Sequence, residues 1–124
     1  MSLRSQVRVR LLLGEDIAFG PGKADLLEAI QRAGSISAAA KTLDMSYRRA
    51  WMLVETMNGC FQSPLVKSAK GGRGGGGAEV TPDGLLVLEA FRRLQREVAQ
   101  VVDAHLPAFE QRARRPRRRS APKA

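Results

Sequence analysis

Residues 35–58 read SISAAAKTLDMSYRRAWMLVETMN and form two short helical patterns on either side of a break at residues 43–45. Each pattern opens with a serine, Ser35 or Ser46, whose hydroxyl can accept a hydrogen bond from a free backbone N–H of the first helical turn. Two short helices joined by a tight turn are typical of a helix-turn-helix motif. We expect the rest of the chain to hold this motif in place.

The two halves of the motif offer different side chains. Residues 38–40 are alanines, and such small side chains let one helix approach another closely without leaving a void. In the second half, apolar residues recur at the spacing of one helical face, and the other side chains fall mostly on the opposite face. The expected packing face holds Ala50, Leu53, Val54 and Met57, and the opposite face holds Tyr47, Arg48, Arg49, Met52 and Glu55.

Positive charge is unevenly distributed along the 124 residues. The formal net charge is +9, but residues 112–124 contribute +7 of it and contain no acid. Such a run is usually a solvated tail and only sometimes a nucleic-acid arm. Residues 41–73 hold six basic and two acidic side chains, so basic charge is also concentrated on the candidate motif.

The chain is poor in residues that carry catalysis or bind metals. Cys60 and His105 are the only cysteine and histidine, which excludes an intrachain disulfide and a metal-ligand cluster. A nucleophile and base pair would need these two residues to meet by coincidence, so we expect no enzyme and no cofactor. The apolar run at residues 11–13 is too short for a signal peptide or a membrane span. We therefore expect a cytoplasmic protein.

A hairpin and a helix are expected before the motif. Every second residue from Val7 to Leu13 is apolar, which predicts a half-buried strand that turns at residues 14–16 into the short run 17–19. A helix then opens at Gly20-Pro21-Gly22 and ends at Gly34 in a left-handed cap. Its buried face is expected to hold Leu26, Leu27 and Ile30.

A glycine-rich hairpin is expected after the motif, once Asn58-Gly59 has ended the second helix. Strands are predicted at residues 65–68 and 78–81, and the loop 69–77 between them holds six of the 12 glycines. A nucleotide-binding loop would need Lys-Ser/Thr leading into a helix, which is absent, and a flexible linker is the simpler alternative. We favour a wing that follows a DNA backbone, with Lys70 and Arg73 at its tip.

A long helix is predicted to start at Thr81-Pro82-Asp83 and to run to about Leu106, where Pro107 stops it. Such a helix is roughly 35 to 40 Å long, more than a small domain needs, which suggests a partner helix. Packing within its own domain is the alternative. The apolar stripe comprises Val87, Phe91, Leu94, Val98 and Val101.

Several short motifs occur together along this region. They are Gly34-Ser35-Ile36-Ser37, Ala39-Ala40-Lys41, Ser46-Tyr47 with Ala50-Trp51, Met57-Asn58, and the wing at residues 71–78 before Thr81. This combination resembles the N-terminal DNA-binding domain of the molybdate-responsive ModE family and, more distantly, LysR-type DNA-binding domains. The fold implied is a mostly α winged helix-turn-helix with an N-terminal β-hairpin and a long C-terminal dimerisation helix.

The resemblance implies a homodimeric, sequence-specific transcriptional regulator that binds double-stranded DNA at a palindromic operator. ModE proteins with a sensor carry a further molybdate-binding portion, and this sequence ends in an arginine tail instead. We therefore expect no molybdate binding by this chain. The expected organisation is a winged domain at residues 1–106, with its dimerisation helix at 82–106, and a disordered tail at 107–124.

The expected recognition helix, residues 46–58, would present its first turn to the major groove. Arginine can pair bidentately with guanine, so we expect Arg48 to read a base and Arg49 to read a base or hold phosphate. Ser46 caps the helix, and Met52 lies on the same helical face as Arg48 and Arg49. Lys41, Lys70 and Arg73 are the expected phosphate clamps.

Two aromatic residues of this helix have alternative roles. Tyr47 contacts DNA through its hydroxyl or ring, or it packs against the preceding helix. Trp51 is a core anchor or a groove-facing ring, and burial is favoured because indole surface is costly to leave in water. The alternative function is a protein–protein interaction module on a winged-helix scaffold, because fold and function separate readily.

Overall fold

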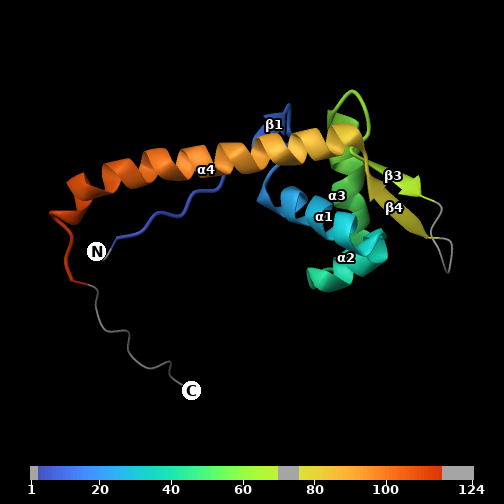
Figure 1. The fold of residues 1–124 in the computed structure, drawn as a ribbon, viewed down its shortest axis with the longest axis horizontal. Helices are drawn as coiled ribbons and strands as arrows, with labels where there is room; N and C mark the ends of the chain where they lie inside the picture. Colours follow the sequence, from blue (N-terminus) through green and yellow to red (C-terminus); the bar gives the residue numbers. More distant parts are fainter. Residues whose placement is uncertain (1–2, 70–75, 116–124) are drawn as a thin grey trace, which may run out of the picture. The chain divides into compact units, whose positions relative to one another are not determined.

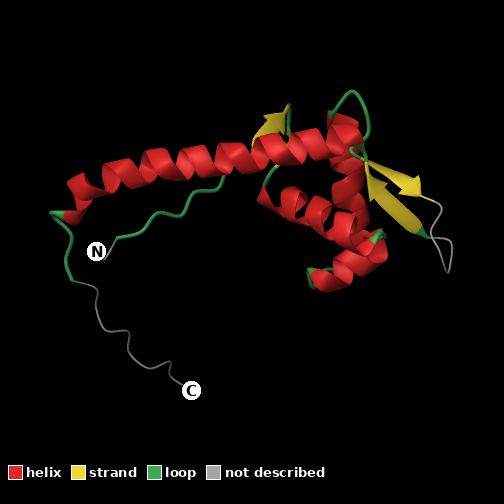
Figure 2. Cartoon of the chain, viewed as in Figure 1, coloured by secondary structure: helices red, strands yellow, loops and turns green. Residues whose placement is uncertain are grey.

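The chain consists mainly of helices with two small hairpins, as the sequence predicts (Figures 1 and 2). The computed structural model describes residues 3–69 and 76–115. These fall into two compact units, residues 8–94 and a smaller unit of residues 3–7 with 95–115. In chain order the elements are β1 (Leu11–Leu13), β2 (Asp16–Phe19), α1 (Pro21–Ala33), α2 (Ile36–Thr42), α3 (Tyr47–Cys60), β3 (Val66–Ala69), β4 (Gly77–Val80) and α4 (Pro82–Glu110).

Side-chain caps start both helices of the helix-turn-helix. The Ser35 hydroxyl accepts a hydrogen bond from the Ala38 N–H at 3.0 Å, and the Ser46 hydroxyl accepts one from the Arg49 N–H at 3.1 Å. Between the helices, Asp44 adopts a left-handed backbone with φ of 55°, which turns the chain sharply. The predicted caps and the predicted break between α2 and α3 are confirmed.

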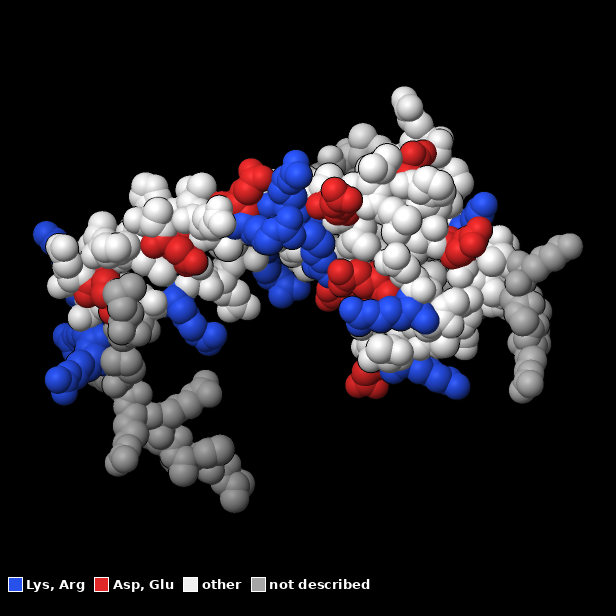
Figure 3. Space-filling view, viewed as in Figure 1, with Lys and Arg blue, Asp and Glu red and all other residues white. Residues whose placement is uncertain are grey.

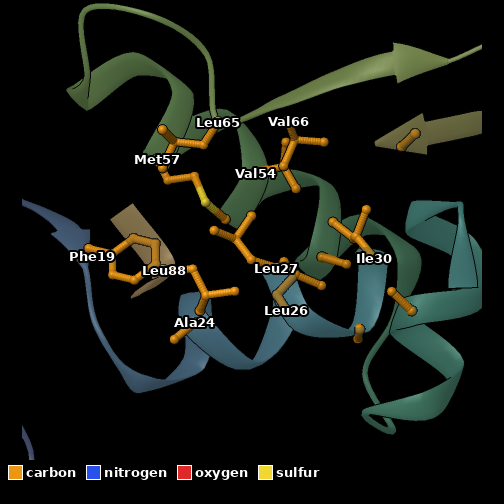
Figure 4. Close-up of a cluster of buried hydrophobic side chains, with 14 of the residues drawn as sticks. Phe19, Ala24, Leu26, Leu27, Ile30, Val54, Met57, Leu65, Val66 and Leu88 are labelled. Atoms are coloured by element: carbon orange, nitrogen blue, oxygen red, sulfur yellow. The ribbon is translucent and has the colours of Figure 1, made fainter. Parts of the chain in front are cut away.

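The core of residues 8–94 lies where α1, α3, β2 and the first turns of α4 meet (Figure 4). The Phe19 ring packs edge to face against Phe91, with ring centroids 5.1 Å apart, and against Phe61, at 6.4 Å. Of the predicted small residues of α2, Ala39 and Ala40 are buried and Ala38 is half-buried, which lets α2 lie close to its neighbours. The predicted packing faces of α1 and α3 supply Leu26, Leu27, Ile30, Ala50, Val54 and Met57 to this core.

Gly34 ends α1 as predicted. Its φ is 78°, a left-handed conformation that side chains with a Cβ rarely adopt, and its N–H donates to the Ile30 carbonyl at 2.8 Å. The Gly34 carbonyl in turn accepts a hydrogen bond from the Ala78 N–H at 2.9 Å. This bond ties the end of α1 to the second hairpin.

The N-terminal hairpin is shorter and more exposed than predicted. Regular pairing begins at Leu11 rather than Val7, and the register is irregular between Leu11 and Leu12. All three leucines of β1 are exposed, Leu12 the most, at 66%. The prediction of a half-buried strand is wrong for residues 11–13, because β1 is held mainly by its partner strand, whereas β2 packs against α1 and α3. Of the predicted apolar residues before β1, Val9 packs against the core.

The second hairpin forms as predicted, with each strand displaced by one residue. β3 and β4 pair antiparallel, with Val66 opposite Val80 at the base. At this base the Thr81 hydroxyl donates to the Pro64 carbonyl at 2.7 Å and accepts from the Gly84 N–H at 2.9 Å, so it caps α4 as predicted. Residues 70–75, which include most of the predicted tip, lie outside the described residues.

Helix α4 continues past its predicted end and includes Pro107. The prediction that Pro107 stops the helix is wrong because a proline removes only one backbone donor, and the next turn is still closed. The Gln111 N–H donates to the Pro107 carbonyl at 3.3 Å, and the Arg112 N–H donates to the Phe109 carbonyl at 3.0 Å.

The smaller unit pairs the N-terminal segment with the C-terminal half of α4. The Leu3 N–H donates to Glu110 Oε2 at 2.9 Å, and the Ser5 hydroxyl donates to Asp103 Oδ1 at 2.8 Å. The bond from Leu3 adds support to the last turn of α4, beyond the proline. Across residues 3–69 and 76–115, α4 included, no helix combines the length and apolar character that a membrane crossing requires.

Candidate nucleic-acid interface

Helix α3 separates a packing face from an exposed face. Its buried residues are Ala50, Val54 and Met57, and their spacing of three and four keeps them on one side. The exposed face begins at the capped first turn, where Arg48 and Arg49 are both open to solvent. Backbone N–H groups and two cationic side chains therefore meet at one end of α3, which suits an anionic ligand. The large exposed side chains of this helix are Tyr47 (56%), Trp51 (46%) and Met52 (52%).

Trp51 lies at the surface, so the expectation that it is buried is wrong. The space beneath α3 is already filled by smaller side chains, above all Ala50 and Val54 on the adjacent positions of the packing face. A tryptophan one residue after Ala50 points away from that face, because successive helical positions are about 100° apart. Trp51 instead lines a groove together with Tyr47.

This groove lies between α3 and the second hairpin and has a volume of about 440 Å³. The exposed face of α3 therefore lies beside strands β3 and β4, as the winged helix-turn-helix arrangement requires. Polar side chains from both elements line it, so it is a wet surface cleft and not a core cavity. The α3 residues that line it are Tyr47, Trp51, Val54, Glu55 and Asn58, and the hairpin residues are Val66, Lys67, Ser68, Ala69, Gly76, Gly77 and Ala78.

Asn58 holds the base of the β3–β4 hairpin against α3. Its Nδ2 donates to the Val66 carbonyl at 3.0 Å, and its Oδ1 accepts from the N–H groups of Leu65 and Val66 at 2.8 and 3.2 Å. The prediction that Asn58-Gly59 ends the helix is wrong by one residue, because α3 continues to Cys60. An asparagine two residues before the helix end carries no sequence signal for such a clamp, and we identify this role only from the structure.

The other predicted contacts are distributed around this site. Lys41 is exposed on α2. Lys67, which lines the groove, pairs with Glu79 across the hairpin at 3.2 Å between Nζ and Oε1. Lys70 and Arg73 lie outside the described residues. On the face shown in Figure 3, the largest group of basic side chains lies in the middle of the view with acidic side chains beside it, and the other basic side chains are scattered.

The predicted dimerisation stripe on α4 is only partly exposed. Within residues 8–94, Phe91 is fully packed into the core, and Val87 and Leu94 pack against it. In the smaller unit Val98 is half-buried and Val101 is 60% exposed. The part of the stripe before residue 95 therefore packs within its own domain, which was the alternative to a helix–helix seam.

The chain is similar to proteins of the ModE and Mop type. No protein-family model matches it. Over 96 residues it is 40% identical to the molybdenum transport protein ModE of Azotobacter vinelandii, which covers 76% of this chain and 36% of that protein. The chain is homologous to the N-terminal region of ModE proteins. The resemblance inferred from its motifs is confirmed.

Two further relatives of the ModE type agree. Molybdenum-pterin-binding protein MopB of Rhodobacter capsulatus is 41% identical over 85 residues, which cover 68% of this chain and 32% of MopB. The DNA-binding transcriptional dual regulator ModE of Escherichia coli K12 is 34% identical over 89 residues, which cover 72% of this chain and 34% of that protein. The chain spans about a third of the length of the curated relatives it matches.

Solved structures support the same fold. The DNA-binding domain of CbnR in complex with DNA superimposes with a TM-score of 0.56 at 23% identity, over 71% of this chain and 95% of that domain. Full-length CbnR with its target DNA gives 0.52 at 24% identity, over 67% of this chain and 27% of CbnR. These neighbours contain winged-helix DNA-binding domains of the LysR type, and the similarity establishes that this chain has the same fold class.

Proposed function

We propose that this chain is a sequence-specific DNA-binding transcriptional regulator of the ModE type. The observation that carries the proposal is the exposed first turn of α3, which carries Arg48 and Arg49, in a helix that also walls a groove against the β3–β4 hairpin. A helix of this kind fits the major groove of B-DNA, and arginine pairs bidentately with guanine O6 and N7. The homology to ModE proteins and the winged-helix fold support the same function.

In this function each exposed group has a distinct role. Arg48 reads a base, and Arg49 reads a base or holds a phosphate. The Tyr47 hydroxyl and ring, together with Trp51 and Met52, offer a phosphate donor and apolar surface to thymine methyl groups. Ser46 caps the helix, and Lys41, with Lys70 and Arg73 of the wing, neutralises phosphates.

We further propose that the chain acts as a homodimer on a palindromic operator. In that arrangement, two recognition helices would lie about 34 Å apart in successive major grooves. Exposed apolar side chains late in α4, such as Val101 and Phe109, are the surfaces of that helix best suited to a partner helix. The residues that remain available for this seam are fewer than the stripe predicts, because Phe91 is buried in its own protomer.

The experiment that tests the function is selection of duplexes from a random pool, followed by measurement of affinity against salt concentration. A selected palindrome that binds much more tightly than random duplex supports the proposal, and a steep fall of affinity with salt reports the phosphate contacts. Equal affinity for selected and random duplexes contradicts sequence specificity. The competing function, a protein interaction module, predicts no chemical-shift change at residues 46–52 on addition of duplex DNA.

A further inference from the structure

Glu55 is the one acidic residue of α3, and it lies on the exposed face of the helix. It follows Arg48 by seven residues, which is close to two helical turns, so the two side chains project in nearly the same direction. The rise of 1.5 Å per residue separates them by about 10 Å along the helix axis. Met52 lies between them on the same face and is also exposed.

Within residues 3–69 and 76–115, the Glu55 carboxylate has no hydrogen-bond or ion-pair partner. Lys67 lines the same groove, but its ammonium pairs with Glu79 at 3.2 Å. The side chain in this groove that hydrogen-bonds to the hairpin is Asn58, through three bonds. The carboxylate is therefore free to accept hydrogen bonds from a molecule that binds along α3.

A carboxylate at this place is poorly suited to a surface that serves only to hold phosphates. It repels the phosphate backbone, and it weakens the attraction of the neighbouring arginines for any duplex, whatever its sequence. An ionised carboxylate is an acceptor only, and the major-groove edge presents it with exposed donors, the exocyclic amino groups of cytosine and adenine. Cytosine matches it better, because adenine also presents its N7 acceptor, which a side-chain amide satisfies and a carboxylate does not.

We propose that Glu55 is a specificity-determining residue that accepts a hydrogen bond from the N4 amino group of a cytosine in each half-site. This inference rests on the proposed DNA-reading function of α3. The separation of Arg48 and Glu55 places this cytosine about three base pairs from the guanine that Arg48 reads, since base pairs rise by about 3.4 Å. The docked homeodomain helix likewise reads bases through residues spread over two turns.

The experiment compares duplex selection by the full chain and by three variants, Glu55→Ala, Glu55→Gln and Glu89→Gln. Glu89 is exposed on α4, so Glu89→Gln removes the same charge away from α3 and serves as the matched control. We expect the unaltered chain and the control to recover a C·G pair at the stated distance from the Arg48-dependent guanine. Glu55→Ala should lose at least about fivefold in preference at that one pair while its affinity for random duplex is kept or raised.

Glu55→Gln should shift the preference at the same pair from cytosine towards adenine, because an amide can donate to N7 and accept from N6. Circular dichroism and thermal unfolding should show that both Glu55 variants fold like the unaltered chain, since the residue is exposed. If Glu55→Ala keeps every base preference of the unaltered chain, the assignment of Glu55 is wrong. The proposed DNA-reading function of α3 is then unaffected. Loss of base preference in Glu55→Ala at a position that is not a C·G pair also overturns the assignment. An unaltered chain that binds no duplex selectively removes both proposals.

Discussion

The guanidinium of Arg92 on α4 donates two hydrogen bonds to the carboxylate of Glu28 on α1, Nη2 to Oε1 at 2.6 Å and Nε to Oε2 at 3.4 Å. The same Nη2 reaches Asp25 Oδ1 at 2.9 Å. These bonds join residues of α1 and α4 that are 64 and 67 positions apart in sequence. Hydrogen bonds from Arg92, with its charge, hold the pKa of Glu28 below its ordinary value despite partial burial.

Glu28→Gln should lower the free energy of unfolding by about 0.5 to 1 kcal/mol at neutral pH, because the pair is partly solvated. The folded-state pKa of Glu28 is depressed, so its contribution is present above the ordinary glutamate pKa and lost as pH falls through the folded value. Urea unfolding at neutral and acidic pH measures this. The difference between Glu28→Gln and the unaltered chain should vanish in acid, and a difference that is independent of pH would contradict the role of the pair.

Gly84→Ala should destabilise the fold by about 2 kcal/mol or more, because a Cβ there would collide with the Leu65 carbonyl oxygen and lie 2.7 Å from Val80 Cγ1. The first turn of α4 thus requires glycine where it crosses the base of the hairpin. Gly59→Ala is the matched control, since a Cβ on this helical residue meets nothing within 4 Å. It should be neutral or stabilising by up to about 1 kcal/mol. Comparable thermal midpoints for the two variants would show that the close approach is unimportant.

Asn58→Asp tests the clamp between α3 and the wing. The carboxylate can still accept from the Leu65 and Val66 N–H groups, but it cannot donate to the Val66 carbonyl, which it would face with a negative charge. We expect a loss of about 1 to 3 kcal/mol in the free energy of unfolding and weaker binding to the selected duplex. Gln62→Ala, an exposed change nearby, should alter neither quantity. Unchanged stability of Asn58→Asp would mean that the hairpin is held by other contacts.

Arg48→Ala and Lys41→Ala should weaken DNA binding in different ways. Losing a bidentate pair with guanine should cost about 1 to 3 kcal/mol and relax selectivity at one base position. Losing a phosphate contact at Lys41 should weaken selected and random duplexes alike and reduce the salt slope by about one. Affinities for both duplexes over a salt series separate the two effects. A uniform loss for Arg48→Ala would assign this arginine to the backbone and not to a base.

Local chemistry made much of the fold predictable from the sequence. The serine caps, the left-handed Gly34 and the Thr81 start of α4 depend on a few neighbouring residues, and all are confirmed. Misses arose where distant parts of the chain decide the outcome. Trp51 is exposed because smaller neighbours fill the core, and the leucines of β1 are exposed because that strand is held mainly by its partner strand.

The site was predictable to a similar extent. Helical spacing was enough to put Arg48 and Arg49 on the exposed face of α3, although their contacts with DNA stay predictions. Spacing did not reveal that Asn58 holds the hairpin, because its partners are backbone groups of Leu65 and Val66, whose position beside α3 depends on the whole fold. It also suggested one continuous stripe on α4, whereas Phe91 belongs to the core.

The separation of a buried face from an exposed face makes α3 suitable for redesign of its exposed side chains. Ala50, Val54 and Met57 are buried, so an engineered library should leave them unaltered. Positions 48, 52 and 55 can be randomised together without disturbing the scaffold, because their side chains project into solvent. A small set of such variants could supply regulators with new target sequences while the capped ends and the wing clamp keep the same geometry.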